Sequence, residues 1–166
     1  MIMTVVIHDL SDENFSSLFP NMKDNVLVIA DHHDIKKCSE CFYCWTKTPG
    51  KCRLDDHFSV FGDKLAECSR IIIISKCKTG DFSPSIKNIL KRSTCFIHNK
   101  IETDNGSSEI DPIGKNLVLS AYFYGKIPDK SKDLLHYNTR AQALTLNAID
   151  TSVHFVRKSG DIQLEI

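Results

Sequence analysis

The apolar residues of the chain gather in short continuous runs that are separated by polar or mixed segments. Runs of this kind, rich in β-branched residues and without polar alternation, are typical of strands buried on both faces of a sheet. The clearest is the run of four isoleucines at 71–74, which predicts a central strand. Together the runs predict five strands, at residues 4–8, 25–30, 70–75, 116–124 and 151–156.

The segments between these runs have the apolar spacing of helices. Ser11 is a suitable N-cap for a short helix over residues 12–18, because its hydroxyl can accept from a free backbone N–H. Three further helices are predicted, one from Asp55 through Cys68, one that begins at Ser83-Pro84 and one over residues 132–147.

Strands that alternate with helices predict an α/β fold, and the right-handed crossover rule makes its sheet parallel. Five strands in 166 residues suit a single flavodoxin-like domain over 1–166, a three-layer sandwich with strand order 2-1-3-4-5. Ligands of such sheets bind beyond the carboxyl ends of the strands, at the switch point between strands 1 and 3. The segments predicted at this edge are 8–17, 75–82 and 120–125.

Two segments remain outside this pattern. The polar stretch at 99–115 is a long connection, which predicts a mobile lid or an interaction loop. The last residues, 159–166, are expected to form an appendage at the sheet edge.

Composition and charge exclude several classes of protein. Hydrophobic residues make up 42% and charged residues 25%, as in ordinary globular domains. Lys plus Arg equals Asp plus Glu, at 21 each, so no general basic field exists for nucleic acid or an anionic membrane. No apolar run reaches the roughly 20 residues of a membrane helix, and the first residues predict a strand and not a signal peptide.

The seven cysteines favour a reducing compartment, because a secreted disulfide framework would distribute an even number in pairs. We therefore expect a cytoplasmic protein. Four of the cysteines lie within fifteen residues, in the spacing C-x2-C-x2-C-x7-C: Cys38, Cys41, Cys44 and Cys52. This spacing favours an iron–sulfur cluster over zinc, whose ligands usually come as two separated pairs. It also fits four reduced cysteines that pack against the core.

Other candidate sites have equally simple structural explanations. The segment Asp31-His32-His33-Asp34 has metal-ligand residues, but adjacent side chains of an extended segment point to opposite sides. Cys77 lies between two lysines that would lower its thiol pKa, or it is a small buried residue. Cys68 and Cys95 are predicted core residues. Four aromatic residues could stack against a planar ligand or simply pack, namely Trp45, Tyr122, Phe123 and Tyr124.

The segment from Cys41 to Cys52, followed by Leu54-Asp55-Asp56, resembles the flavodoxin-fold NAD(P)H-dependent FMN reductases. Within that family it is most similar to the iron–sulfur flavoproteins, which carry a four-cysteine motif after the second strand. The resemblance continues through 71–80 and 82–92, and more weakly over most of the chain.

The resemblance implies FMN at the switch point, NAD(P)H as electron donor, a small-molecule electron donor or acceptor as partner, and a homo-oligomer, dimer or tetramer. It implies a [4Fe–4S] cluster on the four cysteines of the motif, which would exchange single electrons with the flavin. The cofactor-binding residues that it implies, with Tyr122 from the aromatic group, are Ser11, Asn14, Ser16, Ser17, Ser75, Lys76, Cys77, Lys78, Thr79, Gly80 and Tyr122.

The chain departs from the family in the loop after the first strand. Relatives have glycine and serine there, whose N–H groups and hydroxyls hold the FMN phosphate. Here the loop has no glycine and contains three carboxylates, Asp9, Asp12 and Glu13. Two main hypotheses therefore remain: an FMN-dependent NAD(P)H oxidoreductase or electron-transfer flavoprotein, and a non-enzymatic binding or regulatory module with a degenerate phosphate loop. A third, less favoured hypothesis is that residues 38–52 form a structural zinc loop.

Overall fold

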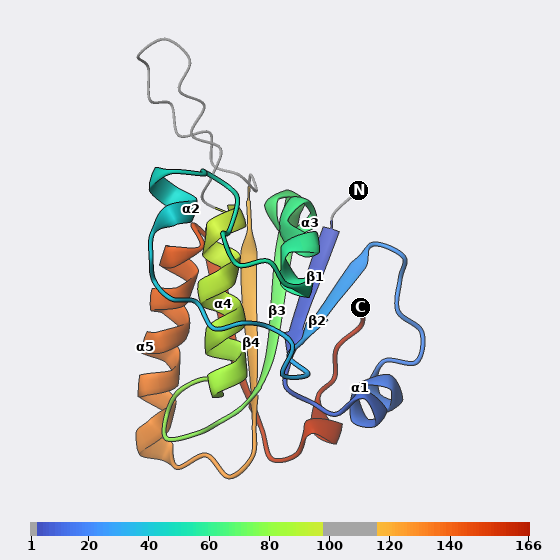
Figure 1. The fold of residues 1–166 in the computed structure, drawn as a ribbon. Coiled ribbons are helices and arrows are strands. Elements are labelled where there is room, and N and C mark those ends of the chain that lie inside the picture. Colours follow the sequence, from blue (N-terminus) through green and yellow to red (C-terminus); the bar gives the residue numbers. More distant parts are fainter. Residues whose placement is uncertain (1–2, 98–115) are drawn as a thin grey trace.

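One parallel sheet organises the chain. In the computed structural model, which describes residues 3–97 and 116–166, five strands pair in the order β2-β1-β3-β4-β5 (Figure 1). Every pairing between neighbours is parallel, so the predicted flavodoxin-like α/β fold is confirmed. The strands are β1 Met3–His8, β2 Val26–Ala30, β3 Cys68–Lys76, β4 Val118–Tyr124 and β5 Asp150–Val156.

The four predicted helices lie close to their expected positions, with one exception, and a further short helix at Tyr43–Thr46 was not predicted. The segment from Asp55 to Cys68, predicted as one helix, is divided into two short pieces, and Cys68 already begins β3. Gly62 stands at the division and packs so closely on Phe96 that a Cβ there would lie 2.6 Å from the ring. The helices are α1 Asp12–Leu18, α2 Tyr43–Thr46, α3 Gly62–Glu67, α4 Pro84–Ile97 and α5 Asp129–Thr145, and the 3-10 turns are η1 His57–Phe61 and η2 Ser159–Asp161.

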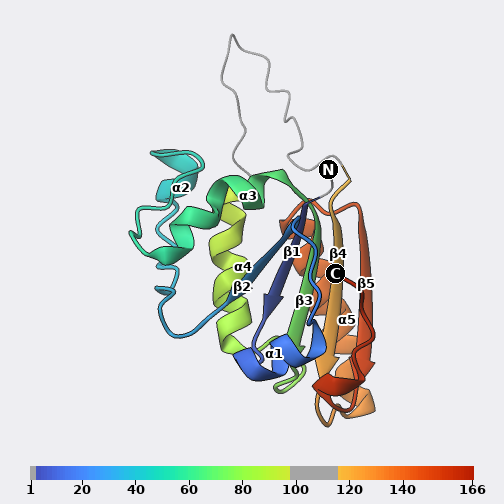
Figure 2. The ribbon, with the colours of Figure 1, turned by 90° about the vertical axis from the view of Figure 1, so that its right-hand side faces the viewer.

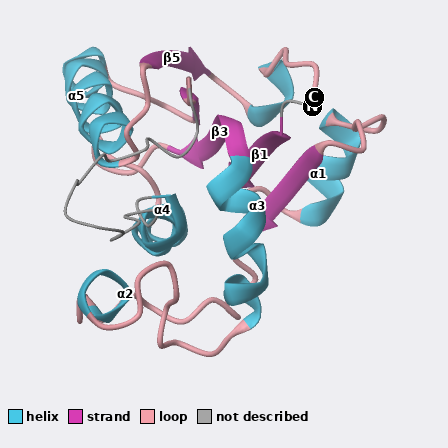
Figure 3. Ribbon diagram, turned by 90° about the horizontal axis from the view of Figure 1, so that it is seen from above, coloured by secondary structure: helices cyan, strands magenta, loops and turns pink. Residues whose placement is uncertain are grey.

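The central strand β3 divides the core into two layers. Its four isoleucines are fully buried and point alternately to the two faces of the sheet. Ile71 and Ile73 pack in the layer formed with α3, α4 and α5, and Ile72 and Ile74 pack in the layer under α1. Seen from above, α4 and α5 lie on one side of the sheet and α1 on the other (Figure 3). The predicted second strand, β2, lies at an edge and is only partly buried.

The C-terminal segment corrects one expectation. Residues 159–166 are not an edge appendage, because Ile162 and Ile166 are buried against the face that carries Ile72 and Ile74 (Figure 2). The reason lies in the length of α1, which has only seven residues and leaves much of this face to be covered. Burial of apolar surface then draws the C-terminal segment onto the sheet.

The predicted lid at 99–115 lies outside the described residues. Among the helices of the described ranges, none combines the length and the apolar character that crossing a membrane requires.

Replacement of Ile162 by Ala tests the role of the C-terminal segment. The substitution removes a buried side chain from the layer that contains Ile72, and we expect the free energy of unfolding to fall by about 2–4 kcal/mol. Urea denaturation measures the change. The matched control is Gln163→Ala, at an exposed neighbouring position, with an expected change within about 0.5 kcal/mol. Equal effects of the two substitutions would contradict a covering role.

Candidate functional site

A cleft with a volume of about 540 Å³ opens at the carboxyl ends of β1 and β3, at the switch point of the strand order. One wall comes from the segment after β2, with Ile35 and Lys37, and the other from the β3–α4 connection and the start of α4. Ligands of parallel α/β sheets bind at this edge. The described residues that line the cleft include Asp9, Lys37, Lys76, Lys78, Asn88 and Tyr124.

Asp9, directly after β1, joins the ends of three strands. Its carboxylate accepts the backbone N–H of Lys76 at 2.9 and 3.1 Å and the hydroxyl of Tyr124 at 2.9 Å, while its own N–H donates to the carbonyl of Ile74. Burial raises the pKa of Tyr124, and the neighbouring Asp9 charge raises it further, so the phenol stays a protonated donor at neutral pH. The switch point therefore contains a fixed negative charge that belongs to the protein.

The residues predicted to hold a phosphate after β1 lie on α1. Ser11, Asn14, Ser16 and Ser17 are all exposed, and none of these four residues lines the described part of the cleft. The hydroxyl of Ser11 accepts the N–H of Asn14 at 3.4 Å and thus serves as the predicted N-cap. The loop contributes the carboxylate of Asp9 to the cleft instead.

His8, at the end of β1, is a buried residue to which the sequence pattern assigned no role. Only 2% of the residue is exposed, and its ring stacks on Phe15 of α1 with centroids 4.0 Å apart. Burial lowers its pKa to about 4, which outweighs the opposite effect of the Asp9 charge, so the ring is neutral at pH 7. His8 is therefore a packing residue, which contacts α1 from the end of β1.

Ser75 and Gly80, both predicted cofactor contacts, have structural roles in the β3–α4 connection. The buried hydroxyl of Ser75 accepts the N–H of Ser83 at 2.9 Å and donates to the carbonyl of Lys76 at 3.2 Å. Gly80 has φ +80°, and a Cβ there would lie 2.8 Å from Leu134 of α5. These contacts shape the connection that carries the cleft lysines.

Of the other predicted residues in this connection, Lys76 and Lys78 line the cleft. Thr79 lines a second groove, with a volume of about 480 Å³, that shares Lys37, Lys78, Pro84 and Asn88 with the first. Cys77 is partly buried and packs against the core.

The second groove extends the row of lysines along α4. Lys87 pairs with Asp81 at 2.6 Å, and Lys91 pairs with Glu40. Within the described ranges, Lys37, Lys76 and Lys78 have no carboxylate at ion-pair distance. The cleft thus combines two carboxylates that already accept backbone N–H groups, Asp9 and Asp31, with three lysines that are available to an anionic ligand.

The four aromatic residues considered as a stacking wall are not brought together. Tyr122 lies on the α1 face of the sheet and stacks on His154 of β5, with centroids 4.4 Å apart. Phe123 points to the opposite face and is fully buried, and Trp45 lies on the exposed helix α2. Of the four, Tyr124 is the one that reaches the cleft.

The four motif cysteines lie in the stretch from Lys36 to Asp56, here called the cysteine segment, which passes along the outside of α4. Their thiols have different environments. Cys41 is exposed, and hydrogen bonds from the N–H of Tyr43 and from Ser39 lower its thiol pKa. Cys44 is half-buried, with a pKa raised by burial, and its side chain is hydrogen-bonded to Cys95 of α4. Cys38 and Cys52 are partly buried.

Cys95 is the thiol of this region that the motif did not include. It lies on the same face of α4 as Asn88 and Arg92, at the i, i+4, i+7 spacing. The sequence shows that these three residues share one face of a helix. It does not show that the cysteine segment passes across this face.

The arrangement of the thiols does not fit a metal centre. Within residues 3–97 and 116–166, no three or more His, Cys, Asp or Glu side chains converge to hold a metal ion. Cys41 in particular is exposed. The predicted [4Fe–4S] cluster on Cys38, Cys41, Cys44 and Cys52 thus has no preformed ligand set, and the structure gives no support to it or to zinc.

The segment from Asp31 to Asp34 is a turn. The carboxylate of Asp31 accepts the N–H of His33 at 2.8 Å, and His33 has a positive φ of 70°. His32 faces Asp12 of α1 at 3.5 Å, at an exposed position. Asp31 and His33 line the cleft, but no three ligands meet here within the described residues.

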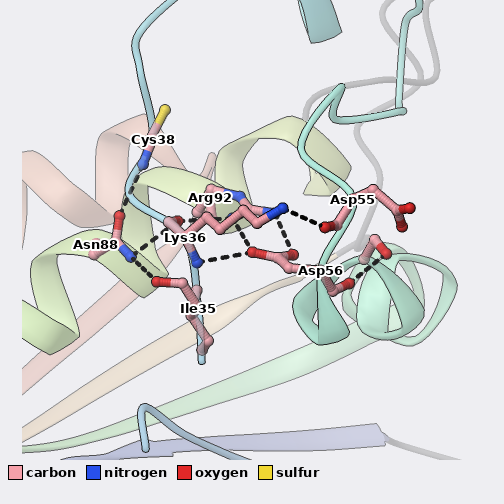
Figure 4. A network of polar contacts seen from close by, with 8 residues as sticks. Ile35, Lys36, Cys38, Asp55, Asp56, Asn88 and Arg92 are labelled. Carbon is pink, nitrogen blue, oxygen red and sulfur yellow. Dashed lines mark hydrogen bonds and ion pairs between the residues drawn. The ribbon is translucent and has the colours of Figure 1, made fainter. Parts of the chain in front are cut away.

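The buried guanidinium of Arg92 holds the cysteine segment against α4 (Figure 4). It donates to both carboxylate oxygens of Asp56, at 2.7 and 2.8 Å, and to the carbonyl of Lys36 at 2.8 Å. Asn88, one turn earlier, accepts the N–H of Cys38 at 3.0 Å and donates to the carbonyl of Ile35. Both ends of the segment are therefore attached to one helix.

Comparison with known proteins shows the fold. No family model matches the chain, and no curated protein matches it in sequence. Among solved structures, the chain is similar to a flavone reductase (TM-score 0.55, 14% identity, covering 96% of this chain and 55% of that one). It is also similar to an NADPH-quinone reductase from P. pentosaceus (TM-score 0.54, 11% identity, 95% and 86% covered).

A third similar structure is an FMN-dependent NADH-azoreductase from Bacillus anthracis in complex with FMN (TM-score 0.53, 13% identity, 98% and 90% covered). The chain spans 55% of the length of the flavone reductase and most of the length of the other two. At these identities the likeness establishes a flavodoxin-like fold.

Replacement of Asp56 by Ala would leave the Arg92 guanidinium buried without its counter-charge. We expect the free energy of unfolding to fall by about 3–5 kcal/mol, as for other broken buried ion pairs. Urea denaturation measures the loss. Asp55→Ala is the matched control, because Asp55 is exposed and contributes its carbonyl, not its carboxylate, to Lys36.

The same pair predicts a pH dependence. Burial raises the pKa of Asp56, but hydrogen bonds from Arg92 and the Lys36 N–H outweigh it and hold the pKa below its ordinary value of 3.8. The ionised carboxylate therefore stabilises the fold above about pH 4, and this contribution is lost as the pH falls through the folded-state pKa. The stability difference between wild type and Asp56→Ala should shrink in that range. A difference that grows on acidification would contradict this assignment.

Proposed function

We propose that the chain is an FMN-dependent NAD(P)H oxidoreductase or electron-transfer flavoprotein whose cofactor binds in the switch-point cleft. The observation that carries the proposal is the cleft of about 540 Å³ at the carboxyl ends of β1 and β3, with Lys37, Lys76 and Lys78 along its lining. This volume is in the usual range for small-molecule and cofactor sites. The flavone, quinone and azo reductases of similar fold support the choice of cofactor.

The residues of the cleft fit FMN in one respect and not in another. The segment after β1 does not fit a phosphate, because Asp9 lies in the cleft and Asp12 and Glu13 occupy the first turn of α1. The three cleft lysines fit a phosphate, because their ammonium groups carry the opposite charge. We therefore infer that these lysines, and not α1, hold the phosphate.

Bound FMN would supply hydride acceptance and the release of single electrons. The chain's own residues would place it. Asp9 fixes the strand ends through Lys76 and Tyr124, and Asn88 keeps the opposite wall in position through the segment after β2. An iron–sulfur cluster is not part of the proposal. Assembly into a homo-oligomer stays a prediction.

The alternative is a non-enzymatic binding or regulatory module of the same fold. The observation that favours it is again Asp9, whose carboxylate already occupies the backbone N–H of Lys76. In that case the lysines of the cleft would bind an anion without redox chemistry.

Anaerobic titration with FMN, followed by NAD(P)H oxidation, separates the two functions. We expect the flavin fluorescence to be quenched with a micromolar or lower Kd, and the loaded protein to oxidise NADH or NADPH well above the rate of free FMN. Lack of flavin binding at millimolar FMN would reject the flavoprotein. Binding without accelerated oxidation would reject the NAD(P)H oxidoreductase and favour the electron-transfer flavoprotein, whereas phosphate binding without flavin binding would favour the non-enzymatic alternative.

Replacement of Asp9 by Asn tests how the phosphate is held. The amide keeps an acceptor for the Lys76 N–H but removes the negative charge, and like charges a few ångströms apart cost on the order of 1–4 kcal/mol at surface-like dielectrics. We expect FMN to bind about tenfold more tightly, roughly 1.4 kcal/mol, in a fluorescence titration.

Two controls accompany this substitution. Glu13→Gln removes an exposed charge on α1 and should leave the FMN affinity unchanged. Riboflavin, which has no phosphate, should bind wild type and Asp9→Asn equally. Weaker FMN binding by Asp9→Asn would show that the carboxylate is needed for the shape of the cleft.

A further inference from the structure

The second groove, beside the cleft, is more basic than the chain as a whole. Over the full sequence Lys plus Arg equals Asp plus Glu, at 21 each. The described lining of this groove, by contrast, includes four lysines and one carboxylate, which are Lys37, Lys78, Lys87, Lys91 and Asp81. Its volume of about 480 Å³ is in the usual range for small-molecule sites. The groove therefore has the size and the charge to hold an anionic group.

The groove and the cleft are neighbouring sites with a shared boundary. Lys37 and Lys78 line both of them. Among the described lining residues, Lys76 belongs to the cleft alone, whereas Lys87 and Lys91 belong to the groove alone. A ligand in the groove would therefore lie beside a ligand in the cleft, and it would have two lysines of its own.

Backbone hydrogen bonds fix the two lysines of the shared boundary. Asn88 of α4 accepts the N–H of Cys38 at 3.0 Å, which holds the adjacent Lys37 beside the helix (Figure 4). Lys78 and Asp81 form a tight turn in which each donates its N–H to the carbonyl of the other, at 3.2 and 3.0 Å. Because these positions are set before a ligand arrives, less conformational entropy is lost on binding.

The two lysines of the groove alone have carboxylate partners of different kinds. Asp81, the partner of Lys87, is also engaged by the N–H of Phe82 at 2.8 Å. Glu40, the partner of Lys91, has a side chain that is 60% exposed, and within the described residues it pairs with no cation besides Lys91. Exposed ion pairs contribute little to stability. Lys91 can therefore exchange Glu40 for another anion at small cost.

We propose that the second groove binds a phosphate monoester, and that Glu40 is an internal anion which Lys91 exchanges for it. A phosphate monoester carries roughly 1.5 to 2 negative charges at neutral pH and three acceptor oxygens, so it can engage several lysines where Glu40 engages one. The role of the site rests on the proposed function, because beside a flavin in the cleft the phosphate would belong to the second reactant. Two sources share this chemistry, the 2′-phosphate of NADPH and a phosphorylated substrate.

Isothermal titration calorimetry of the flavin-free protein tests the site. The probe is adenosine 2′-monophosphate, and adenosine is its uncharged counterpart. We expect the monophosphate to bind, adenosine not to bind, and the affinity to fall as the salt concentration rises. Equal binding of the two compounds would overturn the proposal.

Ribose 5-phosphate distinguishes the two sources in the same titration. Tighter binding of adenosine 2′-monophosphate would assign the groove to NADPH, and NADP⁺ should then bind more tightly than NAD⁺. Tighter binding of ribose 5-phosphate would assign the groove to a phosphorylated substrate.

Variants of the exposed ion pair decide whether Lys91 and Glu40 have the proposed roles. Lys91→Gln should weaken the binding of adenosine 2′-monophosphate by about three- to tenfold. Glu40→Gln frees Lys91 and should strengthen it by about two- to threefold. Lys132→Gln and Asp129→Asn are the matched controls, because they break an exposed ion pair of 2.7 Å on α5, and they should change nothing. Unchanged affinity in Lys91→Gln, or weaker binding in Glu40→Gln, would overturn the proposal.

The FMN titration separates this proposal from the proposed function. FMN is itself a phosphate monoester, but Lys91 is not among the described residues that line the cleft, so Lys91→Gln should bind FMN as the wild type does. Loss of FMN affinity in this variant would show that the groove holds the flavin phosphate, and would overturn the assignment to a second reactant. Lack of FMN binding by the wild type would reject the flavoprotein, while the groove would still be judged by adenosine 2′-monophosphate.

Discussion

The structure depends on the neutralisation of one buried positive charge. The guanidinium of Arg92 is 1% exposed, lies over the ring of Phe58 at 5.1 Å, and would be very costly to bury without a counter-charge. Its partner Asp56 comes from the far end of the cysteine segment, so the segment must return to α4 to reach it. Arg92 and Asp56 also bind the backbone of Lys36, which holds the segment after β2, with the cleft residues Ile35 and Lys37, against α4. One ion pair thereby links the packing of α4 to the shape of the candidate site.

Much of the fold was predictable because local patterns carry it. The isoleucines of β3 admit only a central strand, the alternation of strands and helices predicts a parallel sheet, and five strands in a chain of this length suit the observed order. The C-terminal segment was less predictable, because Ile162 and Ile166 are isolated apolar residues in a polar stretch. Their burial depends on the shortness of α1, which leaves part of one face of the sheet uncovered. No local sequence pattern predicts this uncovered face.

A cleft lies at the edge where the sequence predicted the candidate site, but the arrangement of its lining residues was not predictable. The carboxyl edge of β1 and β3 was expected to hold it, and the lysines at 76 and 78 line the cleft found there. The role of Asp9 depends on Lys76 and Tyr124, which come from two other strands. The partner of Cys44 depends on the path of the segment across α4, because Cys95 is far away in sequence. Long-range pairings of this kind are decided by the fold, whereas residue spacing reports only short-range ones.

The β3–α4 connection links the cleft to a helix on its outer side. Gly80 has a left-handed backbone, its α-hydrogen faces Leu134, and its carbonyl accepts the side-chain amide of Asn138, so α5 holds this connection by two adjacent turns. A side chain at position 80 would need a strained φ, and the exposed side chain of Leu134 would have to move aside. Glycine is therefore favoured at position 80 by its backbone, whichever residue stands at 134. The shape of the cleft in this sense depends on α5, a helix that contributes no described residue to its lining.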